Sequence, residues 1–148
     1  MVIGPARKPR KIVILGDTCD PSSIAEQAMD ADVLVHEATC SNEDLAVALS
    51  KGHSTAGLAG EFARSIRAKH LILNHFSPRG AQVTEYEESK SIRILTQQAR
   101  EAFESDFVYA ARVRDPQKLL SFIFRIFGDF RSQLETNKPW FVVLCLAM

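Results

Sequence analysis

Three short apolar segments place the strongest constraint on the fold. They are 12–15, 33–35 and 71–73, and each consists of aliphatic residues, many of them β-branched, without an intervening polar residue. Strands that are buried on both faces have this composition, whereas strands with one face in water alternate apolar and polar residues. We therefore predict three core strands of a largely parallel sheet.

Helix-capping residues follow the predicted strands, and a fourth strand is predicted over 107–110. Strands that alternate with helices are typical of the α/β class. The predicted helix starts are Asp20–Pro21 before a short helix over 24–29, Ser41 or Asn42 before a helix that ends near Gly52, Ser54 or Thr55 before a third helix, and the capping box of Thr84 and Glu87 before a long fourth helix.

Composition excludes several classes of protein. The chain has 148 residues, of which 46% are hydrophobic and 24% charged, as expected for one globular domain. Because 18 Lys and Arg balance 18 Asp and Glu, the chain as a whole is not a polybasic nucleic-acid binder. Cys19, Cys40 and Cys145 are odd in number and widely spaced, which argues against a disulfide framework. This pattern favours an intracellular location, in the cytoplasm, the nucleus or an organelle.

The apolar segments at both ends of the chain are short. The apolar run that follows the basic residues near the N-terminus is too short for a signal peptide. The apolar run over 140–148 is about half the roughly 20 residues that a helix needs to cross a bilayer. We therefore expect no association with a membrane.

Polar residues come directly after the predicted strands. Gly16-Asp17-Thr18 follows the first strand, His36-Glu37-Ala38-Thr39 ends the second, and Asn74-His75-Phe76-Ser77 follows the third. Loops beyond the carboxyl ends of parallel strands form the ligand crevice of open α/β sheets, so these side chains are expected to converge. His53, in Gly52-His53-Ser54-Thr55 at the start of the third helix, is placed to join them.

The residue types in these loops suit a hydrolytic metal site. A carboxylate such as Asp17 can bridge two divalent ions, neutral imidazole is a zinc ligand, and a His–Glu pair can hold an imidazole ready to protonate a leaving group. Each residue also has a structural alternative: Asp17 as a turn residue, His36 as a half-buried structural histidine, Glu37 as a solvated acid and His53 as a helix cap. His70, which has no acidic neighbour in sequence, is interpreted as structural.

Taken in order, four motifs resemble tRNase Z (ribonuclease Z, ElaC type) of the metallo-β-lactamase superfamily, over about residues 11–110. They are Gly16-Asp17-Thr18, His36-Glu37-Ala38-Thr39, Gly52-His53-Ser54-Thr55 and His75-Phe76-Ser77-Pro78-Arg79. The resemblance implies an α/β fold that corresponds to the C-terminal half of an αββα sandwich. It also implies a zinc-dependent endoribonuclease that removes the 3′ trailer from precursor tRNA.

The resemblance assigns a role to each motif residue. Asp17 matches the carboxylate that bridges two zinc ions, and His75 completes the shell of the second zinc. His53 matches the histidine that protonates or stabilises the leaving oxygen, and Glu37 matches the acid that orients it. The supporting or substrate-binding positions are His36, Ser54, Thr55, Ser77 and Arg79, with Arg79 near the substrate phosphates.

The chain also departs from the family pattern. The His-x-His-x-Asp-His motif, a further zinc histidine and the basic tRNA-binding arm are absent from the 148 residues, which leaves Asp17 and His75 as the expected metal ligands. A zinc site usually takes three or four protein ligands, so we expect the isolated chain to be inactive. The alternatives are an interaction or regulatory fragment that docks on a full-length tRNase Z, on another partner or on a second copy, and a translation product without a stable fold.

Residues 112–148 do not resemble the family. We divide the chain into a partial metallo-β-lactamase domain, 1–111, and a divergent apolar tail, 112–148, with an amphipathic helix predicted over 119–130 and a break at Pro139. Half of a two-sheet sandwich would expose the apolar inner face of its sheet. We hypothesise that the tail covers this surface.

Overall fold

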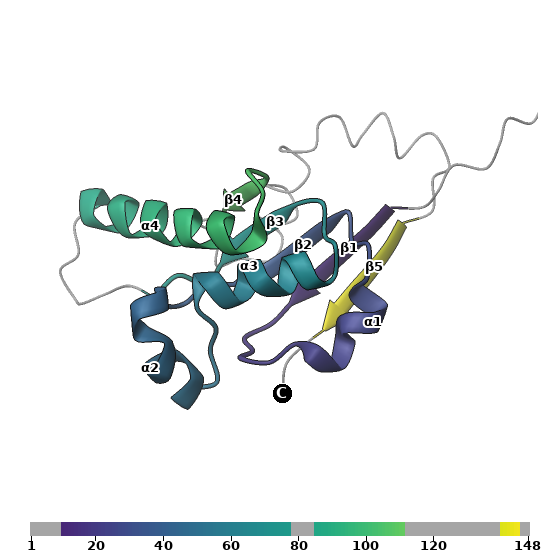
Figure 1. Cartoon of the computed structure of the whole chain (residues 1–148), viewed down its shortest axis with the longest axis horizontal. Helices are drawn as coiled ribbons and strands as arrows, with labels where there is room; N and C mark the ends of the chain where they lie inside the picture. The colour runs from purple at the N-terminus through teal and green to yellow at the C-terminus, as the bar shows by residue number, and fades with distance from the viewer. Residues whose placement is uncertain (1–9, 78–84, 112–139, 146–148) are drawn as a thin grey trace, which may run out of the picture.

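The computed structural model describes residues 10–77, 85–111 and 140–145; for 85–90 and 140–145 it describes the backbone alone. Its centre is a five-stranded parallel sheet in the order β4-β3-β2-β1-β5 (Figure 1). The strands are β1 (Arg10–Leu15), β2 (Val33–Glu37), β3 (Leu71–Asn74), β4 (Val108–Ala110) and β5 (Trp140–Cys145). The first four confirm the four strands predicted from apolar composition.

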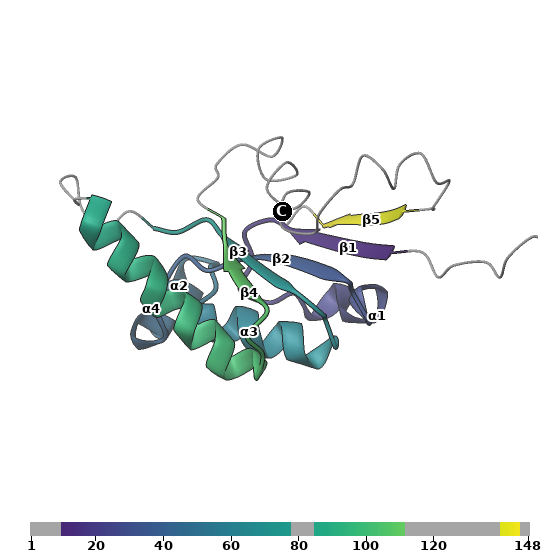
Figure 2. The same cartoon turned by 90° about the horizontal axis from the view of Figure 1, so that it is seen from above.

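Helices connect the strands at the predicted positions. Two single-turn 3₁₀ segments, Ser22–Ile24 and Asn42–Asp44, lead into α1 (Ala25–Ala28) and α2 (Leu45–Ser50), and two longer helices follow, α3 (Ala56–Ser65) and α4 (Glu85–Phe103). α1, α3 and α4 lie on one face of the sheet (Figure 2). Asp20 does not cap a helix but accepts a hydrogen bond from Ser22 N at 3.0 Å, so it forms a turn before the 3₁₀ segment. Among the described residues, no helix combines the length and the apolarity that crossing a bilayer requires.

The strands bury side chains on both faces, as their composition predicts. Toward the helices, alternate strand residues such as Val13, Leu34 and Leu71 pack with α3 and α4 in one cluster. On the opposite face Ile12, Val33, Val35 and Ile72 form a second cluster and are between 0 and 4% exposed. The face that a half sandwich was expected to expose is therefore buried at these four positions, and the hypothesis that the tail covers it stays a prediction.

The described part of the tail is a strand of the sheet. β5 pairs in parallel with β1 along its whole length, from Arg10 opposite Trp140 to Leu15 opposite Cys145. The amphipathic helix predicted over 119–130 lies outside the described residues. A short apolar run such as 140–145 has no periodicity that distinguishes a strand from a buried helix. Its strand conformation depends on pairing with β1, which lies about 130 residues away in the sequence.

α3 and α4 approach each other closely at Gly60. A Cβ at this position would lie 2.5 Å from the carbonyl oxygen of Ala99 and 2.9 Å from the Cβ of Ala102. Because one of these neighbours is backbone, the contact cannot be relieved by a change of rotamer. Gly60 therefore allows the helix pair that covers β3 and β4 to pack at this distance.

We expect Gly60→Ala to lower the free energy of unfolding. Alanine in a helix interior is intrinsically better than glycine by about 1 kcal/mol, whereas forcing a methyl group into a packed contact costs about 1–3 kcal/mol. The steric term exceeds the helix-propensity term, so the urea midpoint should fall. Glu61→Ala, at an exposed position of the same helix, should leave the midpoint nearly unchanged; a raised midpoint for Gly60→Ala would contradict the tight contact.

The β1–β5 pairing predicts the effect of removing the tail. A chain that ends at Arg112 loses the strand that satisfies one side of β1, so it should unfold at lower temperature and self-associate. Thermal unfolding and analytical ultracentrifugation measure both effects. A chain that ends at Cys145 retains β5 and serves as the control; unchanged melting and association in the chain that ends at Arg112 would refute both the pairing and the covering role of the tail.

Candidate metal centre

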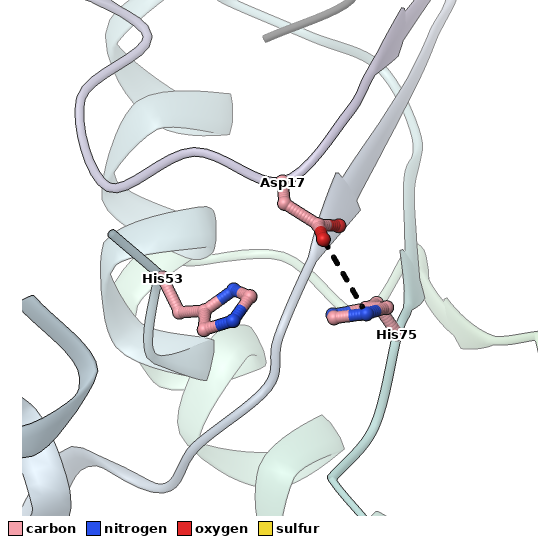
Figure 3. Close-up of side chains that lie close together, drawn as sticks. All are labelled: Asp17, His53 and His75. Atoms are coloured by element: carbon pink, nitrogen blue, oxygen red, sulfur yellow. Dashed lines mark ion pairs between the residues drawn. The ribbon is translucent and has the colours of Figure 1, made fainter. Parts of the chain in front are cut away.

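Asp17, His53 and His75 meet at the carboxyl end of the sheet (Figure 3). Asp17 lies two residues beyond β1, His75 directly follows β3, and His53 lies in the loop between α2 and α3. One potential ligand atom from each residue lies within 4.8 Å of the other two. Asp17 Oδ2 and His75 Nε2 are 3.5 Å apart, and the two imidazole rings have centroids 5.3 Å apart. The strand-end loops thus bring together three of the predicted site residues.

Glu37 is a buried carboxylate that holds this group of loops together. It is the last residue of β2 and only 1% exposed. Its Oε1 accepts hydrogen bonds from Thr18 N at 2.8 Å and from His53 Nδ1 at 3.1 Å, and its Oε2 accepts one from the Thr39 hydroxyl. Burying a carboxylate is costly unless donors replace water, and three donors do so here. Glu37 is therefore not a solvated loop acid.

His75 is fixed by Thr39 and by its own backbone. Its Nδ1 lies 2.9 Å from Thr39 Oγ1, which is also 3.1 Å from the His75 carbonyl oxygen. The φ angle of His75 is 56°, in the left-handed region that few residues other than glycine adopt. Such backbone strain costs about 1–3 kcal/mol and persists where the surrounding contacts fix the conformation. The Ser77 N–H, which bonds to the Thr39 carbonyl at 3.3 Å, contributes to this constraint.

The loop that carries His53 is tied to the β1 loop and to α3. His53 N donates to the Ala48 carbonyl at 2.9 Å, and the Ser54 hydroxyl donates to the Thr18 carbonyl at 2.6 Å. Thr55 is the N-cap of α3, because its hydroxyl accepts from Leu58 N at 3.3 Å. His53 thus does not cap the helix, and Ser54 and Thr55 hold its loop in place.

The other predicted residues lie apart from the three-residue group. His36 is buried among core residues, where its ring meets Phe62 edge-on and its Nδ1 donates to the Glu37 carbonyl at 2.8 Å. The ring of His70 contacts Phe107 and Tyr109. Arg79 lies outside the described residues, so its predicted position near the substrate phosphates stays a prediction.

Thr39 has a role that the sequence reasoning missed. It lies in the His-Glu-Ala-Thr motif, but no function was assigned to it. Its hydroxyl links Glu37, on β2, to His75, beyond β3. The only signal in the sequence is its place two residues after Glu37, which brings both side chains to the same side of the strand end.

The donor set fits a divalent transition metal. Two imidazoles and one carboxylate are among the three-ligand sets of catalytic zinc sites, which keep a further position open. The side chains of Asp17 and His75 are 54% and 47% exposed and that of His53 is 24% exposed, so the site is accessible from solvent. Behind it, Glu37 and Thr39 supply the outer hydrogen bonds that orient metal-binding histidines.

The fold class is shown by comparison with solved structures. A metallo-beta-lactamase fold protein, YhfI from Bacillus subtilis, matches with a TM-score of 0.54 and 24% identity, over 68% of this chain and 36% of that one. The prediction of a partial metallo-β-lactamase fold is thus confirmed. No protein-family model matches the chain.

Sequence comparison shows similarity to ribonuclease Z. The chain is 39% identical to ribonuclease Z from Haloarcula marismortui over 109 residues, which is 74% of this chain and 32% of that protein. It is 46% identical to ribonuclease Z from Bacillus thuringiensis over 101 residues, 68% of this chain and 31% of that protein. The resemblance to ribonuclease Z drawn from the four motifs is confirmed, and the chain spans about a third of the length of these relatives.

Burial of His36 predicts that stability falls on the acid side of neutrality. Burial lowers the pKa of His36 below its usual value of about 6.5, and the hydrogen bond to the Glu37 carbonyl opposes this only in part. Between the unfolded pKa and the lower folded pKa, the unfolded chain binds a proton that the folded chain does not. The free energy of unfolding should therefore decrease as pH falls through this window, by at most about 1.4 kcal/mol per pH unit for this residue.

His36→Leu should flatten this dependence. Urea midpoints measured between pH 7.5 and 5 should fall less steeply for the variant than for the parent chain, whatever its stability at pH 7.5. His36→Met, a second apolar replacement, separates the loss of the titrating group from the loss of a particular packing arrangement. Equal slopes in the parent and both variants would show that His36 is not buried in its neutral form.

Proposed function

We propose that this chain carries part of the active site of a zinc-dependent endoribonuclease that removes the 3′ trailer from precursor tRNA. The observation that carries the proposal is the group Asp17, His53 and His75, with Glu37 hydrogen-bonded behind it, in a chain that is similar to ribonuclease Z. Carboxylate, imidazole and a buried acid at the ends of adjacent parallel strands are the groups that phosphodiester hydrolysis at a metal requires.

Each residue has a distinct task in this proposal. Asp17 and His75 would hold zinc in the complete site, where bound zinc lowers the pKa of a coordinated water and stabilises charge on the phosphoryl oxygens. When His53 carries a proton on Nε2 as well as on Nδ1, it gives the Nε2 proton to the oxygen that leaves as the phosphodiester P–O bond breaks. The attacking water releases its own proton to solvent as its oxygen bonds to phosphorus. Glu37 holds Nδ1 of His53 and keeps the ring oriented. Ser77 and Arg79 are proposed to contact the RNA backbone.

We infer that the chain does not cleave RNA alone. The matched segment makes up about a third of each relative's length. A two-metal site needs more ligands than Asp17 and His75. Activity then depends on ligands supplied by another polypeptide, such as a full-length ribonuclease Z or a second copy, or by sequence upstream of Met1. We propose an intracellular location for this activity, because its proposed substrate is precursor tRNA.

The second candidate is a catalytically inactive fragment that binds a full-length ribonuclease Z. It is favoured by the same fact that limits activity, namely that the chain spans only about a third of its relatives. The two functions differ in one measurable property: a fragment of this kind changes the activity of its partner even when its own His75 is removed.

Cleavage of a 3′-extended precursor tRNA with zinc present tests both functions. The chain alone should be inactive, and addition of the amino-terminal two thirds of a bacterial ribonuclease Z, which contains the His-x-His-x-Asp-His motif, should give a mature 3′ end. His75→Ala should reduce this cleavage at least 100-fold, because it removes a metal ligand. Asp30→Asn, at an exposed position paired with Arg67, should have no effect.

Three outcomes separate the candidates. Cleavage by the mixture that is lost in His75→Ala supports the enzyme. No cleavage by the mixture, together with inhibition of an intact ribonuclease Z by both the parent chain and His75→Ala, supports the inactive binding fragment. Cleavage by the chain alone would contradict the inference that its own ligands are too few. Reading the coding sequence upstream of Met1 for an in-frame His-x-His-x-Asp-His motif is the matching genetic test.

A further inference from the structure

The hydrogen bonds around Glu37 determine which nitrogen of His53 carries a proton. An ionised carboxylate has acceptors only, so the contact between Glu37 Oε1 and His53 Nδ1 requires the hydrogen to be on Nδ1. The neutral imidazole then has its lone pair on Nε2. This nitrogen is the one that remains for a ligand in the group with Asp17 and His75.

The same argument extends through Thr39 to His75. The Thr39 hydroxyl has one hydrogen and three neighbours, which are Glu37 Oε2, His75 Nδ1 and the His75 carbonyl. The carboxylate is the strongest acceptor of the three, so the hydroxyl donates to it. Thr39 Oγ1 must then accept from His75, which places the hydrogen on Nδ1 and leaves the Nε2 lone pair 3.5 Å from Asp17 Oδ2. One buried acid therefore sets the tautomer of both histidines.

We propose that Asp17 and the Nε2 atoms of His53 and His75 form a complete three-ligand site for one zinc ion in this chain, with Glu37 and Thr39 as positioning residues. The proposal rests on the proposed function for the identity of the metal. It assigns His53 a different task in the chain alone from the one it has in the complete enzyme. Where no further ligands are supplied, its Nε2 lone pair binds metal; in the complete site Nε2 takes up a second proton and delivers it to the leaving oxygen.

The geometry supports three ligands for one ion. Ligand atoms around a tetrahedral zinc lie about 3.3 Å apart, since zinc–nitrogen and zinc–oxygen bonds are about 2.0–2.1 Å long. The Asp17–His75 separation of 3.5 Å is already close to this value. One ligand atom of each residue lies within 4.8 Å of the other two, so a small movement of the exposed Asp17 and His75 side chains completes the set. Asp17 adds a negative charge that attracts a cation to the two neutral imidazoles.

Metal affinity distinguishes this role of His53 from that of a proton donor alone. The zinc affinity and stoichiometry of the purified full chain are measured by competition with a chromophoric chelator, and cobalt(II) provides a visible spectrum that reports the number of ligands. The parent chain should bind one zinc per chain. His53→Gln and His75→Gln should each weaken binding at least 100-fold, whereas His70→Gln, at a histidine outside the group, should bind as the parent does.

The link through Thr39 is tested separately. Thr39→Val keeps the shape but removes the hydroxyl, and loss of such an outer hydrogen bond typically lowers metal affinity 10–100-fold. Thr39→Ser should restore the affinity. Thr96→Val removes a hydroxyl that donates to the Ile92 carbonyl within α4 and should have no effect. A merely structural role of Thr39 would lower stability without this selective rescue.

Nitrogen-15 NMR of the unmutated chain supplies a test that needs no variant. Without metal, His53 and His75 should both show the Nδ1–H tautomer, and zinc should shift the Nε2 resonances of both. A zinc-induced shift confined to His75, or retention of zinc by His53→Gln, would overturn the proposal and leave the proposed function standing. Absence of zinc binding by the parent chain would also overturn it. Failure of the proposed function is recognised independently, by zinc binding without any cleavage in the mixture with the amino-terminal part.

Discussion

The rest of the site depends on the hydrogen bonds that the buried carboxylate of Glu37 accepts. Glu37 ends the central strand β2 and bonds to the β1 loop through Thr18 N, to the His53 loop through Nδ1, and to Thr39, which in turn contacts His75. A buried charge is tolerated only when its hydrogen bonds are complete. Each of these loops is therefore fixed by the requirement to satisfy one acid, and displacing any of them would leave that acid short of a donor.

The parallel sheet is what allows one acid to reach so many segments. In a parallel sheet, successive strands end at the same edge, so the residues after β1, β2 and β3 are neighbours although they are far apart in sequence. The strand interiors are apolar on both faces, which leaves the strand ends as the place where polar groups find partners. The strained φ of His75 belongs to this arrangement, because the contact with Thr39 holds the residue at the point where the chain leaves β3.

Composition and position predicted most of the fold. The strands over 12–15, 33–35 and 71–73 were predictable because burial on both faces leaves a clear apolar signature, and Thr55 was predictable as a cap because a threonine before a helix has a local function. The strand β5 was not, since its structure depends on pairing with β1 rather than on any local signal. Residues 112–139, where a helix was predicted, lie outside the described part of the chain.

The sequence predicted which residues come together at the site, but it did not predict the hydrogen bonds between them. Strand-end position predicted that Asp17, Glu37 and His75 converge and that His53 joins them, and it wrongly included His36, which lies in the core. The motif resemblance added the roles of these residues. The burial of Glu37 and the link through Thr39 arise from loop packing that no spacing rule encodes.

The hydrogen-bond pattern also bears on what a partial chain can do. An active site whose residues were positioned mainly by the absent two thirds of the relatives would be left without defined orientations in this chain. Among the described residues, the orienting contacts of His53 and His75 come from residues between Thr18 and His75. These hydrogen bonds lie within the part of the chain that matches ribonuclease Z, so they do not require the unmatched part of the relatives. In the function proposed above, ligand orientation therefore depends on Glu37 and its donors, whereas catalysis depends on further metal ligands.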